Sequence, residues 1–389
     1  RSARTPHNVG NLMTSHPSSA LTVIPVVTRE ELNQFIALPW SIYGDDPHWV
    51  PPLKSDVRNA FDHEKHPFHK HSEAQPFLAL RGSVPVGRIC AIRNRNHETF
   101  HEEPVGFFGW FECVDDVEVA TALFDVVREW LRFRDLKIMR GPTSFSTNET
   151  CGLLVDGEPG PPSVMMAYNP KYYPNLLQAC GLTKVKDLYA WQMDDQMDMG
   201  YLLRGEKLVT RRYGITMRSF DMAKFDTELE TVRSIYNAAW EKNWGFVPMT
   251  DEEIDHMAAE LKPILEPKLA LFVEDSDGVP IGFALALPDF NQVLKKMDGK
   301  LWPFGIFKAL IAKRRINWMR VIILGLVEEW RGKGIDVLLY LGLIRAGREV
   351  GITQGEQSWI LEDNDKMNAA IKRLGGQMYR TYRLYEIPL

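Results

Sequence analysis

The residues best suited to chemistry lie in one short segment, 331–336, which reads Arg-Gly-Lys-Gly-Ile-Asp. An apolar, β-branched run at 321–326 precedes it and predicts a buried strand, and the run at 337–347 predicts a helix. A chain that turns through two glycines from a strand into a helix has free N–H groups at the helix start. Those donors, the helix dipole and the charges of Arg331 and Lys333 favour a phosphate-bearing ligand.

A simpler interpretation of this segment stays open. The glycines could serve only the backbone geometry of a strand–helix turn. Asp336 also places a carboxylate close to the phosphate position, unless its side chain points away or caps the helix. Short glycine motifs match by chance, so the surrounding elements must decide between the two interpretations.

The composition of the chain narrows the class of protein. Its 389 residues are enough for two or three domains, and 45% hydrophobic with 25% charged residues is ordinary for a folded protein. A net charge of −5 argues against a general nucleic-acid binder, so no nucleic-acid partner is expected. The four cysteines are scattered without a Cys-x-x-Cys pair, which predicts buried free thiols in a reducing compartment.

Targeting and metal-binding signals are weak throughout the chain. No run of 18 apolar residues exists, so we expect no transmembrane helix. Residues 1–20 are polar, lack the apolar core of a signal peptide and predict a disordered arm. Four histidines crowd 63–71, but their spacing is irregular and no cysteine or paired acid completes a ligand set, so no metal is expected.

The chain contains the same local pattern twice. Residues 77–89 and 271–283 each combine an apolar strand, a glycine-containing turn and a second strand with Val-Pro-(Val/Ile)-Gly. Both predict β-hairpins. A strand at 21–26, followed by a helix that Thr28 and Glu31 cap, precedes the first hairpin.

The second hairpin has matching flanks, a strand at 215–220 and a helix over 227–240. We therefore predict an α/β fold with a mixed sheet and two tandem domains, at 21–200 and 205–389. One α/β domain with two coincidental hairpins is the alternative.

The two halves differ at the turn where a phosphate would bind. In the first half a strand at 105–113 leads through 114–118 into a helix over 117–133. This turn has no glycine and three carboxylates, which cap the helix and repel a diphosphate. The first domain is thus predicted to be degenerate, and the second to carry the site.

The elements after the glycine segment complete a family pattern. Residues 354–364 predict a strand, 365–374 a helix ended by two glycines, and 377–387 a last strand. With this order, segment 331–336 resembles the acyl-CoA pyrophosphate loop of the GNAT superfamily of N-acyltransferases, Arg/Gln-x-x-Gly-x-Gly/Ala. The match holds at its first and fourth positions and fails at Asp336, where the family has a small residue.

The resemblance implies transfer of an acyl group from acetyl-CoA or a longer acyl-CoA to an amine. Backbone N–H groups near the end of the strand would hold the thioester carbonyl. The CoA-binding residues that the resemblance implies are Leu326, Val327, Arg331, Gly332, Lys333, Gly334, Ile335, Asp336 and Asn364.

A carboxylate would take the proton of the amine. Side chains alternate along a strand, so Glu356, Ser358, Ile360 and Glu362 are expected on one face. Glu356 and Glu362 are the candidate bases, with Glu328 third; the alternative is that they are solvent-facing acids or ion-pair partners of Arg380 or Arg383.

At the position of the acid that protonates the leaving thiolate, this chain departs from the family pattern. Many family members carry a tyrosine four residues before the glycine that ends the last helix, and this chain has Ile371 there. The acid is therefore absent or supplied elsewhere, with Tyr379 and Tyr382 as candidates.

An insertion at 289–320 separates the second hairpin from the strand before the glycine segment. Its part at 301–318 combines apolar residues at helical spacing with tryptophans and a Lys-Arg-Arg run, a composition suited to a membrane interface or a lipid acceptor. A lid helix packed on the first domain is the alternative. The chain also resembles a bacterial GNAT-like group that includes ceramide synthases, which N-acylate a sphingoid base.

These observations predict a cytoplasmic N-acyltransferase whose acceptor is a small-molecule or lipid amine, with peripheral contact to the inner membrane through 301–318 as one option. The resemblance places 240–246 in the acceptor loop. Two other functions stay open, an acyl-CoA-binding pseudo-enzyme and an aminoacyl transferase with a peptide acceptor.

Overall fold

The computed structural model describes residues 20–194, 197–240, 243–299 and 315–389. Residues 300–314, which hold most of the segment predicted to contact a membrane, lie outside the described residues. Within the described ranges, no helix is both long and apolar enough to span a bilayer.

The N-terminal half begins with a strand and a helix before its first hairpin, as expected. In chain order its elements are β1 (Leu21–Pro25), α1 (Arg29–Tyr43), α2 (Lys54–Ala60), η1 (Pro67–Lys70), β2 (Glu73–Arg81), β3 (Val84–Arg93), α3 (Arg95–His101), β4 (Val105–Cys113), α4 (Val117–Arg132), β5 (Ile138–Gly141), β6 (Thr143–Ser144), β7 (Ser146–Cys151), β8 (Leu153–Gly157), α5 (Tyr173–Ala179) and β9 (Thr183–Asp194).

The C-terminal half repeats this order around its own hairpin. Its elements are α6 (Met199–Tyr213), β10 (Thr216–Ser219), η2 (Met222–Lys224), α7 (Phe225–Trp240), α8 (Asp251–Leu261), η3 (Pro267–Leu269), β11 (Ala270–Glu274), β12 (Pro280–Pro288), α9 (Asn291–Leu294), β13 (Trp318–Leu326), η4 (Glu328–Trp330), α11 (Asp336–Val350), β14 (Gln354–Leu361), α12 (Asp365–Arg373) and β15 (Gln377–Pro388).

The predicted hairpins and helix cap are confirmed. β2 pairs with β3 and β11 with β12, both antiparallel. Thr28 caps α1 in a capping box with Glu31, which satisfies amides that the first turn would otherwise leave free. The four cysteines are buried free thiols.

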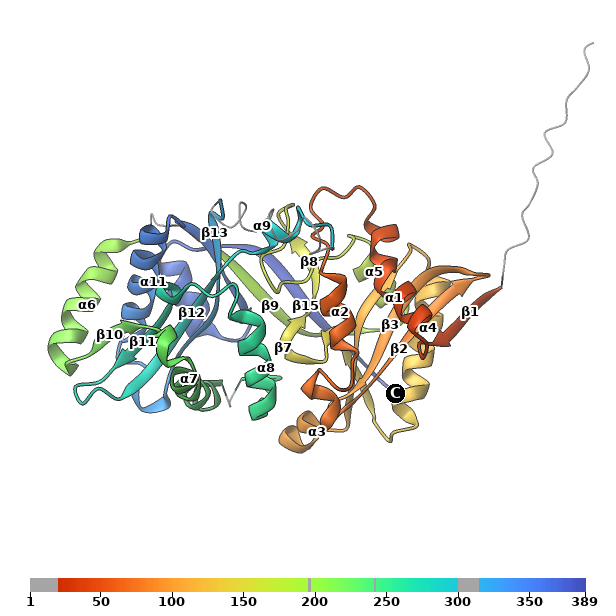
Figure 1. The fold of residues 1–389 in the computed structure, drawn as a ribbon, viewed down its shortest axis with the longest axis horizontal. Coiled ribbons are helices and arrows are strands. Elements are labelled where there is room, and N and C mark those ends of the chain that lie inside the picture. Colours follow the sequence, from red (N-terminus) through yellow and green to blue (C-terminus); the bar gives the residue numbers. More distant parts are fainter. Residues whose placement is uncertain (1–19, 195–196, 241–242, 300–314) are drawn as a thin grey trace, which may run out of the picture.

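A single mixed sheet runs through both halves, with helices packed on its faces (Figure 1). Its strand order is β1-β2-β3-β4-β5-β15-β9-β14-β13-β12-β11-β10. The last strands of the two halves are therefore exchanged at the centre, since β15 pairs with β5 and β9 pairs with β14.

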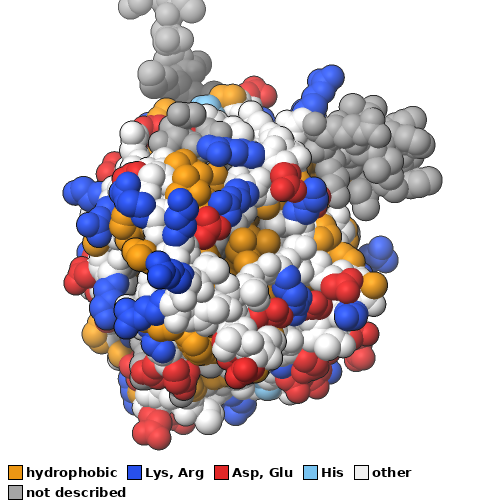
Figure 2. All heavy atoms as spheres, turned by 90° about the vertical axis from the view of Figure 1, so that its left-hand side faces the viewer, with side chains coloured by type: hydrophobic (Ala, Val, Ile, Leu, Met, Phe, Trp, Pro, Cys, Tyr) orange, Lys and Arg blue, Asp and Glu red, His pale blue; other side chains and the backbone are white. Residues whose placement is uncertain are grey.

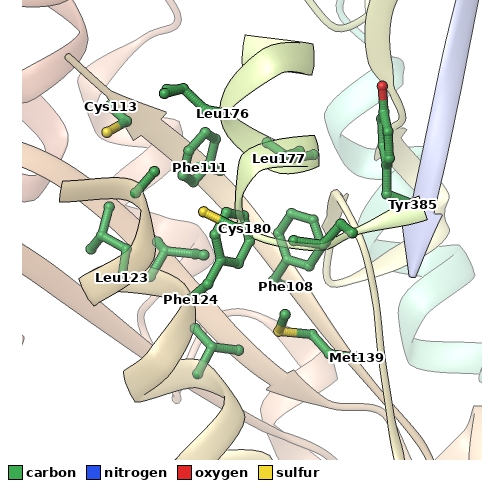
Figure 3. Packing of buried hydrophobic residues seen from close by; sticks show 14 of the residues in the cluster. Phe108, Phe111, Cys113, Leu123, Phe124, Met139, Leu176, Leu177, Cys180 and Tyr385 are labelled. Carbon is green, nitrogen blue, oxygen red and sulfur yellow. The ribbon is translucent and has the colours of Figure 1, made fainter. Parts of the chain in front are cut away.

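This exchange also joins the two cores. Tyr385 on β15 belongs to the buried cluster that Phe108, Phe124 and Leu177 form in the N-terminal half, as Figure 3 shows. Burial of an apolar side chain of this size contributes about 1.5–3 kcal/mol, and the Tyr385 hydroxyl, buried without a partner among the described residues, offsets part of this gain. The C-terminal strand thus fixes the two halves relative to each other.

Two pairs of parallel strands diverge, one in each half. β13 pairs with β14 only from Trp318 to Val321, although β13 continues to Leu326. In the N-terminal half, β4 pairs with β5 over three residues, from Val105 to Phe107. In each half the two strands therefore separate toward the carboxyl end of the first strand of the pair, which is β13 in one half and β4 in the other.

Candidate active site

The glycine segment forms the turn between η4 and α11, at the end of β13. Gly332 and Gly334 have φ values of +72° and +78°, which side-chain-bearing residues rarely adopt. Among the described residues, a Cβ on Gly332 would meet no atom within 4 Å, and one on Gly334 would meet only Val209 Cγ2 at 3.8 Å. The loop is therefore open above both glycines.

Backbone amides remain available in this loop. The N–H of Arg331 donates to Glu328 O at 3.1 Å, and that of Val337 donates to Gly334 O at 3.3 Å. In the part of the chain that the structure describes, the amides between them, from Gly332 to Ile335, have no acceptor. Such successive free donors at a helix start form an anion-binding site.

The carboxylate of Asp336 does not occupy these donors. It lies against its own amide and that of Val337, so it acts on the first turn of α11. Burial raises the pKa of Asp336, and the two amides offset part of this rise. Ile335 holds the N-cap position of α11 and no side chain caps it, so the carboxylate of Asp336 points away from the loop amides without capping the helix.

The cations of the loop have different roles. The Nε of Arg331 donates to Leu326 O at 3.0 Å and ties the loop to the end of β13. Lys333 is exposed, with its Nζ 4.2 Å from the centre of the Trp330 ring. Arg331 thus holds the loop in shape, while Lys333 can approach a ligand from solvent.

A donor for a carbonyl oxygen is found at Leu326. The N–H of Val327 donates to Ile281 O at 3.0 Å, so the expectation that Val327 holds a thioester carbonyl is wrong. Because donors alternate between the two sides of an antiparallel strand, the Leu326 N–H points away from β12, into the opening between β13 and β14.

A cleft of about 630 Å³ starts at the loop and enters this opening. Arg331, Gly332 and Asp336 line one wall, and Asn364 and Lys366 of the β14–α12 junction line the other. Asn364 caps α12 through its Oδ1, which accepts from Met367 N at 3.2 Å. Within the described ranges its amide nitrogen has no acceptor, so it can donate to a ligand.

A second cavity of about 170 Å³ continues the cleft inward. The two share Trp240, Asn243, Trp244, Leu324, Leu361, Asn364 and Met367, so they form one channel. The inner cavity is mostly apolar, and the predicted acceptor loop contributes Trp240, Asn243, Trp244 and Phe246.

The N-terminal half also reaches the inner cavity, which the sequence did not indicate. Thr147, Asn148 and Glu149 on β7, together with Met165, line it. Glu149 is the one carboxylate among the described lining residues, and burial raises its pKa well above the ordinary value. The acidic turn at 114–118 argues against a phosphate site in this half, and no local motif marks Glu149.

Glu356 lies in a buried polar network below the channel. Its Oε1 accepts from Ser358 Oγ at 2.5 Å and lies 3.7 Å from Arg320 Nε, and its Oε2 accepts from the Tyr379 hydroxyl. It lines a separate cavity of about 40 Å³ and neither part of the channel. The geometry suits a structural ion pair better than a base.

The other candidate catalytic residues lie away from the channel. Glu362 accepts from Lys184 Nζ at 2.6 Å on the surface, and Tyr382 is fully buried in a cluster with Leu188 and Leu384. The expected shared face of Glu356 and Glu362 is wrong, because β14 shifts register after Gln357 and ends at Leu361.

The remaining candidates for the acid and the base do not line the channel. Glu328 is exposed on η4, and Ile371 is fully buried. Tyr379 is committed to Glu356 through its hydroxyl. In the described ranges, no group of three or more His, Cys, Asp or Glu side chains could hold a metal ion.

Comparisons with known proteins support the interpretation of the fold. The chain is 35% identical over 373 residues to "Bacterial ceramide synthase" of Caulobacter vibrioides, covering 94% of this chain and 97% of that protein. It is 34% identical over 367 residues to "Protein YghO" of Escherichia coli, covering 92% and 93%. No protein-family model matches the chain.

A solved structure shows the same architecture. A tandem GNAT protein from the clavulanic acid biosynthesis pathway superposes with a TM-score of 0.56 at 13% identity, covering 95% of this chain and 98% of that one. At this identity the likeness concerns the fold alone. The mixed α/β fold of two tandem units predicted from the repeat is confirmed.

Proposed function

Because the chain belongs to the tandem-domain GNAT acyltransferases that include bacterial ceramide synthase, we propose that it transfers an acyl group from acyl-CoA to a long-chain lipid amine such as a sphingoid base. The single observation that carries the choice of donor is the loop at 332–335, whose free amides stand at the mouth of the channel. They suit the diphosphate of CoA.

The shape of the channel supports this donor. With the diphosphate at the loop, the pantetheine arm would run between β13 and β14, past Asn364. The thioester carbonyl would reach the Leu326 N–H, where negative charge develops during attack. Figure 2 faces the end of the molecule that carries α6, where Lys and Arg side chains are numerous and Asp and Glu side chains lie among them.

The lining of the inner cavity supports an apolar acceptor. Its side chains include Trp240, Trp244, Phe246, Met165 and Met257. Apolar surface of this kind favours binding of hydrocarbon over binding of a hydrated amine.

Two measurements test the proposal. Calorimetric titration with CoA and palmitoyl-CoA should show binding by the wild-type chain, and thiol release from palmitoyl-CoA should depend on an added sphingoid base much more than on ethanolamine. If neither CoA nor palmitoyl-CoA binds, acyl-CoA is not the donor. Equal rates with both amines would remove the lipid acceptor.

A pair of glycine variants links binding to the loop. Gly334→Trp should abolish CoA binding, because a bulky side chain at φ +78° fills the space above the free amides. Gly351→Trp is the matched control, since Gly351 has φ +79° and open surroundings at the other end of α11. Similar melting temperatures with loss of binding in only the first variant are expected.

A further inference from the structure

We propose that Glu149, supplied by the N-terminal half, binds the ammonium group of the acceptor and takes its proton during acyl transfer. This rests on the proposed function and adds a catalytic residue to it. In this proposal the N-terminal half, which has no CoA-binding loop, contributes a residue to catalysis.

The first support is position. Glu149 lines the inner cavity together with Leu324 of β13, two residues before the Leu326 amide that would hold the thioester carbonyl. The strand that carries Glu149 is attached to the acceptor loop of the other half. Thr147 Oγ1 donates to Gly245 O at 2.5 Å, and Asn148 Nδ2 donates to Val247 O at 2.9 Å.

A third bond completes this attachment. The hydroxyl of Tyr236 on α7 donates to Asn148 Oδ1 at 2.9 Å. The two residues just before Glu149 are thus fixed to the C-terminal half by three hydrogen bonds. The backbone that carries the carboxylate is therefore held in one place relative to β13, as a catalytic group requires.

The second support is charge. The other charged group of the cavity, Arg320, already has Glu356 and Ser358 as partners, with its Nε 2.8 Å from Ser358 Oγ. Glu149 has no salt bridge within the described part of the chain. A cationic amine entering the cavity would therefore find one uncompensated carboxyl group.

The surroundings of Glu149 disfavour its charged form in the empty site. Burial raises its pKa, and Glu260 and Glu253 on α8 raise it further. Those two acids lie next to histidines, with 3.3 Å between His256 Nε2 and Glu260 and 3.0 Å between His71 Nε2 and Glu253. The ionisable groups around the carboxyl are Glu253, Glu260, His256, His71, Tyr236 and Arg320.

An ammonium ion would reverse this effect, because an adjacent positive charge favours the carboxylate. The pair could then exchange a proton in a largely dehydrated site, where a base with a raised pKa is effective.

The step balances as follows. The ammonium nitrogen gives one proton to Glu149, and its lone pair attacks the thioester carbon. The C–S bond breaks as the C–N bond forms. The second proton passes from the nitrogen to the thiolate sulfur, and CoA departs as the thiol. The products are the amide and CoA, and Glu149 releases its proton to solvent.

The test compares Glu149→Gln with Glu252→Gln, an exposed acid of α8 next to Lys70. Glu149→Gln should lower kcat by about 10²-fold or more at pH 7, with CoA affinity retained and the melting temperature no lower than that of the wild type. Glu149→Asp should keep intermediate activity. In wild type, the rate should rise with pH as the carboxyl ionises, and this limb should vanish in Glu149→Gln.

The outcomes separate the two proposals. Wild-type protein that binds no CoA contradicts the proposed function itself. Wild-type protein that binds CoA and transfers acyl groups, with a Glu149→Gln rate equal to that of Glu252→Gln, overturns the role of Glu149. A rate loss in Glu149→Gln without any change in the pH profile also overturns it, because a positioning effect would leave that limb in place.

Discussion

Replacing Glu356 by Gln tests whether this residue holds the fold or performs the chemistry. The side chains of Glu356 and Arg320 are 0% and 6% exposed, so removal of one charge leaves the other buried without its counter-ion. Breaking a buried pair in this way costs about 3–5 kcal/mol. The Gln oxygen can still accept from Ser358, which favours the lower end of this range.

We expect Glu356→Gln to lower the free energy of unfolding by about 3 kcal/mol. For a chain of 389 residues, that corresponds to a fall in melting temperature of about 4 °C. The double variant Arg320→Met/Glu356→Gln should be less destabilised than the sum of the single changes, because no lone charge remains. Calorimetry and denaturant unfolding measure both quantities.

Turnover supplies the second readout. At a temperature where Glu356→Gln is folded, thiol release from acyl-CoA should stay within a few-fold of wild type, since Glu356 lines neither part of the channel. An unchanged melting temperature combined with a loss of kcat of about 10²-fold or more would refute this reasoning and assign the base to Glu356.

Three further predictions concern stability. Gly332→Ala and Gly351→Ala should each cost about 1–2 kcal/mol, because both have positive φ and open surroundings, but only the first should weaken CoA binding; equal CoA affinities would contradict the loop assignment. The pKa of Glu149 is raised in the folded state, so ionisation of this carboxyl destabilises the wild-type fold as pH rises. Glu149→Gln should therefore raise the melting temperature more at pH 8 than at pH 4; an increase independent of pH would contradict this. Burial raises the pKa of Asp289 from 3.8 to about 6. The folded state therefore binds this proton more tightly than the unfolded state, and wild-type stability should fall by about 3 kcal/mol between about pH 4 and 6 because of this residue. Asp289→Asn should flatten that dependence of unfolding free energy on pH; an unchanged dependence would contradict the prediction.

The elements of the fold could be predicted because their signals are local. The capping box at Thr28, the two hairpins and the strand at 105–113 depend on residues within one turn or one strand pair. The glycine loop was recognisable for the same reason, since two positive φ values require glycines at fixed positions.

Features that depend on distant partners could not be predicted in the same way. The sequence of β15 does not indicate that it pairs with β5 of the other half. Alternation of polar and apolar residues predicts which side chains face the core, but it does not predict which strand lies next to it. The register shift after Gln357 broke the alternation that placed Glu362 beside Glu356. Glu149 enters the cavity only through contacts of β7 with residues almost 100 positions later.

The central claim is that the amides of 332–335 hold the diphosphate of CoA at the mouth of the β13–β14 opening. A crystal structure with a non-hydrolysable acyl-CoA tests it most directly. We expect diphosphate oxygens within about 2.7–3.2 Å of these amide nitrogens and the acyl carbonyl oxygen at the Leu326 N–H. A diphosphate bound elsewhere, or an acyl carbonyl outside the channel, would contradict it.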